Sequence, residues 1–382
     1  MTLPPSPTLP ASLTCDIFCR VVDNYGDIGV AWRLARQLAG ERGVTVRLIV
    51  DDLDSFQKLA PLVVPGLPTQ FVDGVTVMAW RDGLTVSSVA DLAIEAFACE
   101  LPGAYLELMA HRTPSPVWIN LEYLSAEEWV AEHHLLPSPH PVLPLTKFFF
   151  FPGFTAATGG LIREQGLIAR RDLMATANVD AKLRVLVFAY DHAPVEALLT
   201  AMTQMTKLAI CRVSEGGLAT KLEHWRGSQA INAPEAAPVL EFEVLPFVPQ
   251  TEFDALLWRH DVLFVRGEDS FVRAQWAARP FIWHAYPQSD GAHLVKLNAF
   301  LDLYCSGLPA PAEKAVRELS QAWNVPHTEA VGPAWTAFVA QLPVLNVHAR
   351  RWSQHLSEMP DLVSNLLSFY RKNAKLQGFA AS

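Results

Sequence analysis

Short, continuously apolar segments alternate with amphipathic ones along most of the chain, and this alternation runs twice. In the first half, apolar runs at residues 16–22 and 44–50 flank an amphipathic segment at residues 30–39. The pattern restarts at residues 184–190 and continues to residues 281–283. Apolar strands that alternate with helices are typical of parallel sheets covered by helices on both faces. The sequence therefore predicts two doubly wound α/β domains.

Composition suggests where these domains begin and end. Residues 1–14 are rich in proline and serine and lack the basic and apolar regions of a signal peptide, so we expect a flexible tail. We place the N-terminal domain at residues 15–172 and the C-terminal domain at residues 181–352. A glycine pair and several charged residues within residues 153–180 indicate the linker between them.

The charge balance limits the classes of partner. The chain has 30 Lys and Arg against 39 Asp and Glu, for a net charge of −9, which excludes nucleic acid or an anionic membrane as a bulk electrostatic partner. Its five cysteines are odd in number and not closely paired, which indicates reduced, structural thiols. No apolar run approaches the length of a membrane span. We therefore expect a soluble, cytoplasmic protein.

The first strand is followed by a loop, Asp23 to Gly29, that leads directly into a helix. Gly26 and Gly29 are not spaced as in a dinucleotide-binding turn, and two carboxylates in this loop would repel a phosphate. Asp23 and Asp27 instead suit a cationic ligand, with one side chain holding it and the other accepting a proton. In the structural alternative, Asp23 ends the strand and Asp27 caps the helix. The spacing leaves both interpretations open.

A strand, a sharp loop and a helix follow one another from Val265 onward. We expect the helix to begin at Asp269 or Ser270, so that unbonded N–H groups and the positive end of the helix dipole face the end of the sheet. Arg266 and Arg273 add cationic donors, and together these groups predict a diphosphate site within an acidic protein. The alternative is an ordinary capped helix whose arginines pair with surface acids.

Long motifs in both halves resemble one bacterial family. Residues 16–36, DIFCRVVDNYGDIGVAWRLAR, resemble the opening of the elongation factor P arginine rhamnosyltransferases (EarP). Residues 266–276, RGEDSFVRAQW, resemble the donor-site motif of that family, and residues 120–127, 150–154 and 290–297 agree with it as well.

The second motif also resembles the nucleotide-sugar signature of GT-B glycosyltransferases, except that Arg273 stands where those enzymes usually have a ribose-contacting glutamate. The family resemblance implies a GT-B fold, with two Rossmann-like domains facing a cleft. We expect a C-terminal helix within about residues 355–382 to pack back on the N-terminal domain.

The resemblance implies that L-rhamnose is transferred from dTDP-β-L-rhamnose to an arginine of elongation factor P, with inversion of the anomeric centre and without a metal or other cofactor. No nucleic acid or membrane partner is expected. Two alternatives stay open: a GT-B enzyme with another donor and acceptor, and a protein that binds a translation factor without chemistry.

The same resemblance suggests residue roles. Asp27 matches the proposed general base of that family, and Asp23 matches an essential carboxylate next to it. Glu268 matches an essential glutamate in the family's donor-binding loop. The residues expected to bind the donor are Arg266, Asp269, Ser270, Tyr286, Gln250, Phe188, Tyr190, Phe247 and Phe253. Carboxylates are suitable partners for an acceptor guanidinium, whose delocalised lone pairs make it a poor nucleophile.

Two possible metal motifs carry less weight. Asp-x-Asp within residues 51–54 resembles the manganese signature of GT-A enzymes, but acidic strand ends are common and we expect a solvated loop. His133, His134 and His140 lie in a proline-rich stretch without the spacing of zinc ligands, so no metal site is predicted there.

Overall fold

A computed structural model describes residues 13–380 except residues 24, 82–85, 87, 175–181, 233–239, 289 and 326–327. The chain divides into two compact units. Unit 1 consists of residues 1–124, 129–165 and 360–382, and unit 2 consists of residues 125–128 and 166–359. Most of the expected N-terminal tail, residues 1–12, lies outside the described residues. Leu13 is already buried and the first strand begins at Thr14.

Unit 1 is built on a mostly parallel sheet, whose strand order over the described residues is β3-β4-β2-β1-β5-β6-β8-β7. Its strands are β1 (Thr14–Cys19), β2 (Thr45–Val50), β3 (Thr69–Val72), β4 (Val75–Ala79), β5 (Leu92–Ala96), β6 (Val117–Leu121), β7 (Pro137–Pro139) and β8 (Thr146–Phe150). Its helices are α1 (Gly26–Arg42), α2 (Leu53–Leu59), α3 (Gly103–His111), α4 (Trp129–His133) and α14 (Leu362–Ala380). The edge strands β3 and β7 pair antiparallel with β4 and β8, which differs from the expected all-parallel sheet.

The position of β1 inside the sheet explains why its residues 17–19 are apolar. Successive side chains of a strand point to opposite faces of the sheet. Ile17 belongs to a core shared with α1 and α14, whereas Phe18 packs on Tyr105 of α3, with 4.8 Å between ring centroids. Helices therefore cover both faces, and neither face of β1 tolerates a polar run.

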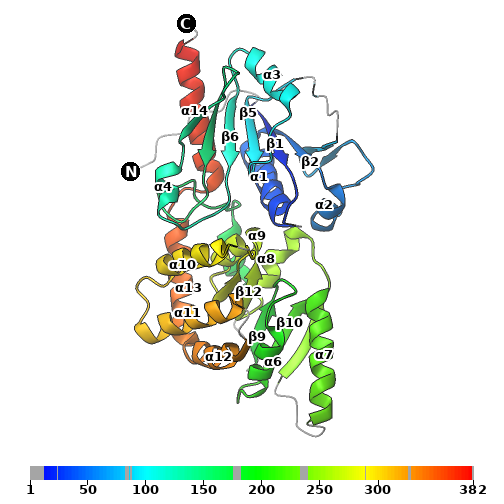
Figure 1. Ribbon diagram of the computed structural model, residues 1–382, viewed down its shortest axis with the longest axis vertical. Helices are drawn as coiled ribbons and strands as arrows, with labels where there is room; N and C mark the ends of the chain where they lie inside the picture. Colours follow the sequence, from blue (N-terminus) through cyan, green and yellow to red (C-terminus); the bar gives the residue numbers. More distant parts are fainter. Residues whose placement is uncertain are drawn as a thin grey trace. The chain divides into compact units, whose positions relative to one another are not determined.

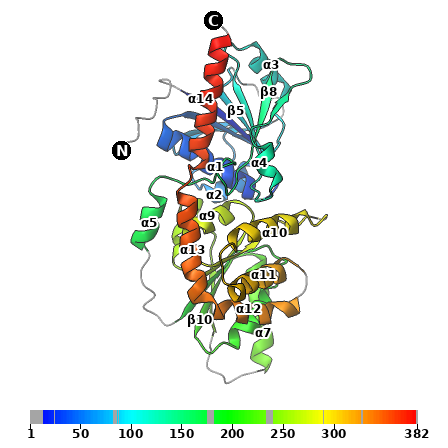
Figure 2. The ribbon, with the colours of Figure 1, turned by 90° about the vertical axis from the view of Figure 1, so that its left-hand side faces the viewer.

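The C-terminal helix α14 belongs to unit 1, although it is separated from the rest of that unit by the whole of unit 2. Leu366 is 1% exposed in the same core as Ile17. Phe369 makes edge contacts with Phe148 and Phe150 of β8, at 5.1 and 6.4 Å between ring centroids. Figures 1 and 2 show α14, in red, running along the sheet of this unit. The apolar stripe of α14 thus completes the core of unit 1.

Unit 2 contains a parallel sheet of strand order β11-β10-β9-β12-β13, as far as the structure describes it. Its strands are β9 (Leu183–Val187), β10 (Ala209–Ser214), β11 (Leu240–Leu245), β12 (Val262–Arg266) and β13 (Phe281–His284). Its helices are α5 (Leu167–Met174), α6 (Val195–Thr203), α7 (Gly217–Asn232), α8 (Gln250–Trp258), α9 (Asp269–Ala277), α10 (Ala292–Tyr304), α11 (Ala310–Asn324), the 3-10 turn η1 (Thr328–Ala330), α12 (Val331–Ala340) and α13 (Leu342–Ser357).

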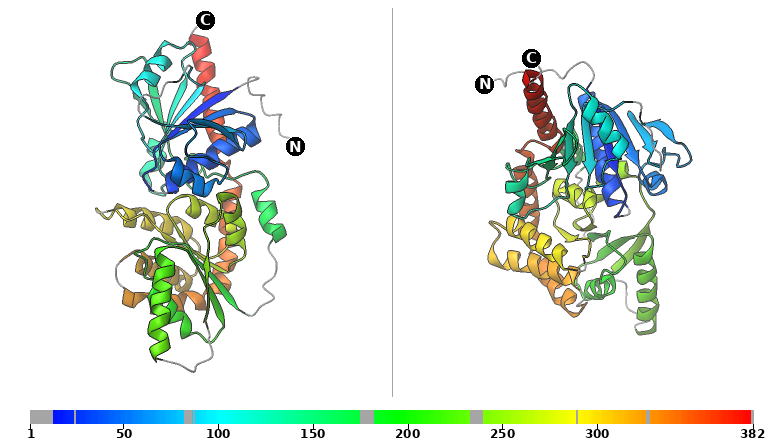
Figure 3. Two further views of the ribbon diagram at one scale, coloured as in Figure 1. Left: turned by 90° about the vertical axis from the view of Figure 1, so that its right-hand side faces the viewer. Right: turned by 45° about the horizontal axis from the view of Figure 1, so that its top comes forward.

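Helices cover both faces of this sheet as well (Figure 3). On one face, Phe264 of β12 contacts Trp323 of α11, with 4.4 Å between ring centroids. On the other face, Trp283 of β13 stacks on Phe271 of α9 at 4.1 Å. Unit 2 is therefore doubly wound, as the repeated apolar pattern predicts.

Two local predictions need correction. Strand β9 ends at Val187, so Phe188 and Tyr190 follow the strand and lie beyond its carboxyl end. By its sequence, the segment from Ser125 to Glu128 fits a capping box at the start of a helix, but it does not form one, because α4 begins only at Trp129. The Ser125 hydroxyl instead accepts a hydrogen bond from the backbone N–H of Glu127 at 3.1 Å. A short polar turn, not a helix cap, therefore occupies these residues.

Candidate active site

The first candidate residues lie in the loop between β1 and α1 and in the first turn of α1. This loop follows the strand at which the order of the unit 1 sheet reverses, the usual place for a ligand in an open α/β sheet. Asp23 is half-buried, and its carbonyl oxygen accepts a hydrogen bond from Gly26 N at 2.6 Å. A Cβ atom at Gly26 would lie 2.7 Å from Asp23 Oδ2. Glycine is therefore needed at position 26 for Asp23 to keep its conformation.

Asp27 is 1% exposed, and its carboxylate is held by residues on both sides of it. Its Oδ2 accepts hydrogen bonds from Val22 N at 2.8 Å and Asp23 N at 2.9 Å. Its Oδ1 accepts one from the hydroxyl of Tyr123 at 3.1 Å. The N-terminus of α1 has no side-chain cap, so the structural alternative in which Asp27 caps this helix is wrong. The carboxylate instead organises the loop that precedes α1.

Tyr123 is a site residue that the sequence analysis did not single out. It follows β6, and its ring stacks on Phe97 with 4.4 Å between centroids and 18° between planes. This stacking orients the hydroxyl toward Asp27. The only sequence signal is an aromatic residue just after a buried strand, within the family-like motif at residues 120–127.

The candidate donor residues of unit 2 gather at the carboxyl ends of β9, β12 and β13, where the strand order again reverses. Arg266 is the last residue of β12, and its guanidinium carbon lies 4.8 Å from the ring centroids of both Phe188 and Tyr190. Such cation–π contacts orient an arginine while leaving its N–H donors available. Within the described ranges no carboxylate forms an ion pair with Arg266, so its positive charge is available to an anionic ligand.

The helix that follows β12 presents its N-terminus at the same strand ends. Gly267 has a φ of 60°, which allows the sharp turn, and Glu268 is the half-buried N-cap residue. The Ser270 hydroxyl accepts a hydrogen bond from Arg266 N at 3.1 Å and donates one to Arg266 O. The first-turn N–H groups of α9 and the positive end of its dipole therefore lie directly beside Arg266.

Arg273 does not have the role expected of it. Its side chain is 3% exposed, and it donates hydrogen bonds to Asp254 at 2.8 Å and to Asp269 at 3.1 Å. Asp269 also accepts a hydrogen bond from Gln250 Nε2 at 3.0 Å. The expectation that Arg273 supplies a donor to a diphosphate is wrong, because these carboxylates already engage it. Arg273, Asp269 and Gln250 together connect α9 to α8.

Aromatic side chains border Arg266 on several sides. Phe253 contacts Phe188 at 5.2 Å, and Tyr286, which is 47% exposed, contacts Tyr190 at 5.6 Å. Phe247 is half-buried in the connection between β11 and α8. Most of the predicted donor residues therefore surround one cation at the strand ends of a single unit.

His284 is a further residue that sequence reasoning missed. It is 2% exposed at the end of β13, and its Nδ1 accepts a hydrogen bond from Tyr190 N at 3.3 Å. Burial lowers the pKa of His284 to about 3, with smaller contributions from His192 and Arg266. A neutral histidine therefore holds the backbone of Tyr190 beside Arg266.

The possible metal motifs have structural explanations. Asp52 is the N-cap of α2 and accepts a hydrogen bond from Ser55 N at 2.9 Å. His134 Nδ1 accepts a hydrogen bond from Phe151 N at 3.0 Å, and burial lowers the pKa of His134 to about 4. In the ranges that the structure describes, no group of three or more His, Cys, Asp or Glu side chains is arranged to hold a metal ion. None of the described helices is both long and apolar enough to cross a membrane.

The protein has two Rossmann-like units, each with charged and aromatic side chains at the carboxyl ends of its strands. This arrangement defines its class, a glycosyltransferase of the GT-B type. The family model for Elongation-Factor P (EF-P) rhamnosyltransferase EarP matches residues 15–371. The chain therefore belongs to the EarP family.

Relatives and a solved structure agree with this family. The chain is 44% identical to a protein-arginine rhamnosyltransferase of Pseudomonas putida strain KT2440, over 94% of this chain and 99% of the relative. It is 43% identical to one of Pseudomonas aeruginosa strain PAO1, over 93% of this chain and 98% of the relative. A structure solved to explain EarP-mediated arginine glycosylation of translation elongation factor EF-P is 34% identical, with a TM-score of 0.63 over 94% of this chain and 99% of that chain. The chain is thus an enzyme that transfers rhamnose to arginine.

Proposed function

We propose that this enzyme transfers L-rhamnose from dTDP-β-L-rhamnose to an arginine side chain of elongation factor P, with inversion at the anomeric carbon. The family description and the related structure name EF-P and support it as the acceptor. The observation that carries the proposal is the pair of carboxylates, Asp23 and Asp27, at the carboxyl end of β1. In this proposal unit 1 acts on the acceptor and unit 2 binds the donor.

The acceptor needs activation because a guanidinium with a pKa above about 12 is protonated and its lone pairs are delocalised. Asp27, whose orientation is set by Val22, Asp23 and Tyr123, takes the proton from one guanidinium nitrogen as that nitrogen attacks the anomeric carbon. Asp23 pairs with the remaining cationic part of the side chain. A carbon–nitrogen bond forms, and the bond from the anomeric carbon to the dTDP oxygen breaks.

The donor side must stabilise the charge that develops on the leaving dTDP. Arg266 and the N–H groups at the start of α9 offer cationic and dipolar stabilisation to a diphosphate, with Ser270 and Tyr286 beside them. Phe188, Tyr190, Phe247 and Phe253 offer an aromatic surface for the thymine, and Glu268 and Asp269 begin the helix that faces the diphosphate.

These groups supply positive charge without a metal, and the proposed reaction therefore uses none. We expect full transferase activity after treatment with EDTA, measured as the rate of EF-P modification. A loss of activity that Mg²⁺ or Mn²⁺ restores would contradict this part of the proposal.

We also propose that the reaction takes place in the cytoplasm. All five cysteines are buried and form no disulfide, which is the state expected in a reducing compartment. Fractionation of cells that express the tagged full-length protein, followed by immunoblotting, tests this location. Recovery in the periplasmic or membrane fraction would contradict it.

The intact mass of purified EF-P after incubation with this enzyme and dTDP-β-L-rhamnose tests the proposed reaction. The expected result is a gain of one deoxyhexose, localised to an arginine by fragmentation and absent when that arginine is replaced by lysine. A gain in the mass of EF-P with another nucleotide sugar but not with dTDP-rhamnose would show that dTDP-rhamnose is not the donor. The absence of any mass gain with active enzyme would show that EF-P is not the acceptor.

A further inference from the structure

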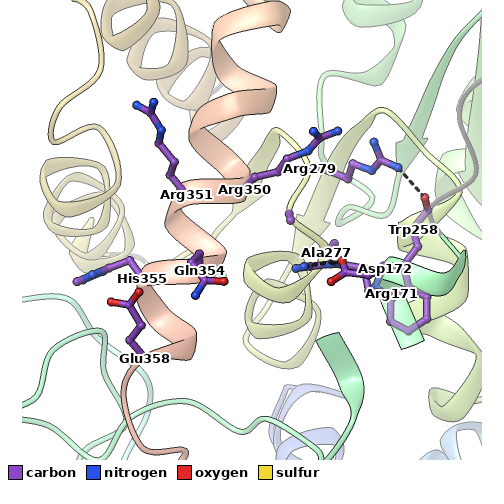
Figure 4. A pocket seen from close by; sticks show the side chains of 11 residues that line it. Arg171, Asp172, Trp258, Ala277, Arg279, Arg350, Arg351, Gln354, His355 and Glu358 are labelled. Carbon is purple, nitrogen blue, oxygen red and sulfur yellow. Dashed lines mark hydrogen bonds and ion pairs between the residues drawn. The ribbon is translucent and has the colours of Figure 1, made fainter. Parts of the chain in front are cut away.

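A cavity of about 680 Å³ in unit 2 lies at the C-terminal end of α9, where Ala277 and Ala278 line it (Figure 4). The donor residues described above lie at the other end of this helix, beside Ser270. A helix of nine residues is about 13 Å long, so the two places are distinct. Nothing in the proposed transfer reaction uses this cavity.

Arginines outnumber the acidic side chains in the wall of the cavity. Arg171, Arg279, Arg350 and Arg351 line it, against the carboxylates of Asp172 and Glu358. Arg171 is already engaged, because it pairs with Asp172 and donates to Trp276 O and Ser353 Oγ at 2.9 Å each. This arginine holds α5 against α9 and α13 and completes the wall of the cavity.

Arg279 and Arg350 carry the excess charge. Arg279 donates a hydrogen bond to Trp258 O at 3.3 Å, and neither Arg279 nor Arg350 forms an ion pair with any described residue. Figure 4 shows Arg350 reaching from α13 toward Arg279, whereas Arg351 on the same helix points elsewhere. Burial lowers the pKa of Arg279. The carboxylate of Asp261 opposes this effect, and the charges of Arg184, Arg350 and Arg171 add to it. Arg279 and Arg350 repel each other, because the nearby carboxylate of Asp261 is already paired with Arg184, and an anion bound between the two arginines would relieve that repulsion.

We propose that this cavity binds a small phosphate-bearing ligand, with a phosphate group held between Arg279 and Arg350. Planar guanidinium groups bind phosphate through paired N–H donors, and a doubly charged phosphate matches the two cations. The cavity is of the size that holds small molecules, about 300–1,000 Å³. The arginines in its wall favour an anionic ligand over a neutral one.

The test uses inorganic pyrophosphate as the probe and isothermal titration calorimetry on the full chain. All proteins carry Arg266→Ala, which removes the arginine of the candidate donor site so that binding there contributes little. Arg350→Gln is expected to weaken the remaining affinity about tenfold, since a hydrogen bond to a charged group contributes about that factor. Arg226→Gln is the control, because it removes the same charge from an exposed position of the same unit that does not line the cavity, and it should change the affinity less than about twofold.

Equal effects of Arg350→Gln and Arg226→Gln would overturn the proposal, because they would show only general attraction of the anion to positive charge on the protein. No pyrophosphate binding by the Arg266→Ala protein would overturn it as well. Neither outcome bears on rhamnose transfer, since the proposal for this cavity does not depend on the reaction at the strand ends.

Discussion

At the β1–α1 loop, a single carboxylate is fixed by groups from two distant parts of the chain. Asp27 accepts two backbone N–H bonds from the loop that precedes α1 and a phenolic hydrogen bond from Tyr123, which lies 96 residues further along. The amide of an Asp27→Asn variant can keep this arrangement, with its oxygen toward the backbone and its NH₂ group toward Tyr123. The charge of this carboxylate can therefore be removed while the loop is preserved.

Tyr123→Phe removes the phenolic hydrogen bond but keeps the ring that stacks on Phe97. We expect kcat to fall about tenfold, because Asp27 loses a partner that orients it, while the KM for dTDP-rhamnose stays unchanged. The rate of EF-P modification at varied donor concentration measures both constants. Equal kcat in the variant and the parent would show that Tyr123 does not position the carboxylate.

His284 makes the stability of the protein depend on pH. Burial holds its pKa at about 3 in the folded protein, below the usual value of 6.5 in the unfolded chain. The unfolded state therefore binds the extra proton between these values, and the free energy of unfolding decreases as the pH falls below 6.5. The contribution of His284 to this slope is at most about 1.4 kcal/mol per pH unit.

The prediction is checked with His284→Gln, which retains an acceptor for Tyr190 N. Its free energy of unfolding, from urea titrations between pH 4 and 7, should depend less on pH than that of the parent. His224→Gln, at an exposed position of the same unit, should leave the pH dependence unchanged. Identical slopes for the parent and His284→Gln would argue against a buried neutral histidine.

At the scale of elements, the apolar pattern predicts the parallel strands well and the antiparallel edge strands poorly. The strand expected at residues 44–50 is found as β2 (Thr45–Val50), with a parallel neighbour on each side, because a strand inside a parallel sheet needs a mostly apolar sequence. The edge strands β3 and β7 were not predicted, since one has exposed positions and the other contains two prolines. Sequence propensity is weakest where a strand is short and only partly buried.

The helix α9 shows which site features the sequence can predict. Its start at Asp269 and the neighbouring Arg266 follow from local sequence and were predicted. The ion pair of Arg273 with Asp254 of α8 was not, because it depends on how two helices pack. Contacts such as Tyr123 with Asp27 and His284 with Tyr190 were missed for the same reason, being 96 and 94 residues apart.

Arg273→Met tests the proposed connection between α8 and α9. Removing the cation leaves the mostly buried carboxylates of Asp254 and Asp269 without their partner, and we expect a loss of about 3 kcal/mol in the free energy of unfolding. Arg226→Met breaks a pair with Glu223 in which both side chains are more than half exposed, and it should have little effect. Urea unfolding of both variants makes the comparison. Equal stabilities would mean that the buried pair contributes no more than the exposed one.

At the scale of the whole molecule, the two units carry opposite charges at their strand ends. Unit 1 presents Asp23 and Asp27, whereas unit 2 presents Arg266 and the N-terminus of α9. The net charge of −9 does not reveal this division, because it averages over the chain. The resemblance of motifs in each half did indicate it. The division implies that donor binding and catalysis can be impaired separately.

The rate of EF-P modification by Asp27→Asn at saturating dTDP-rhamnose tests the central claim most directly. Because the charge that accepts the proton is lost while unit 2 is unchanged, we expect kcat to fall at least about a hundredfold. The affinity for dTDP, measured in parallel, should equal that of the parent, whereas Arg266→Ala should weaken that affinity. Near-normal turnover by Asp27→Asn would contradict the account, because an amide cannot accept the proton and Asp27 would then not be the general base.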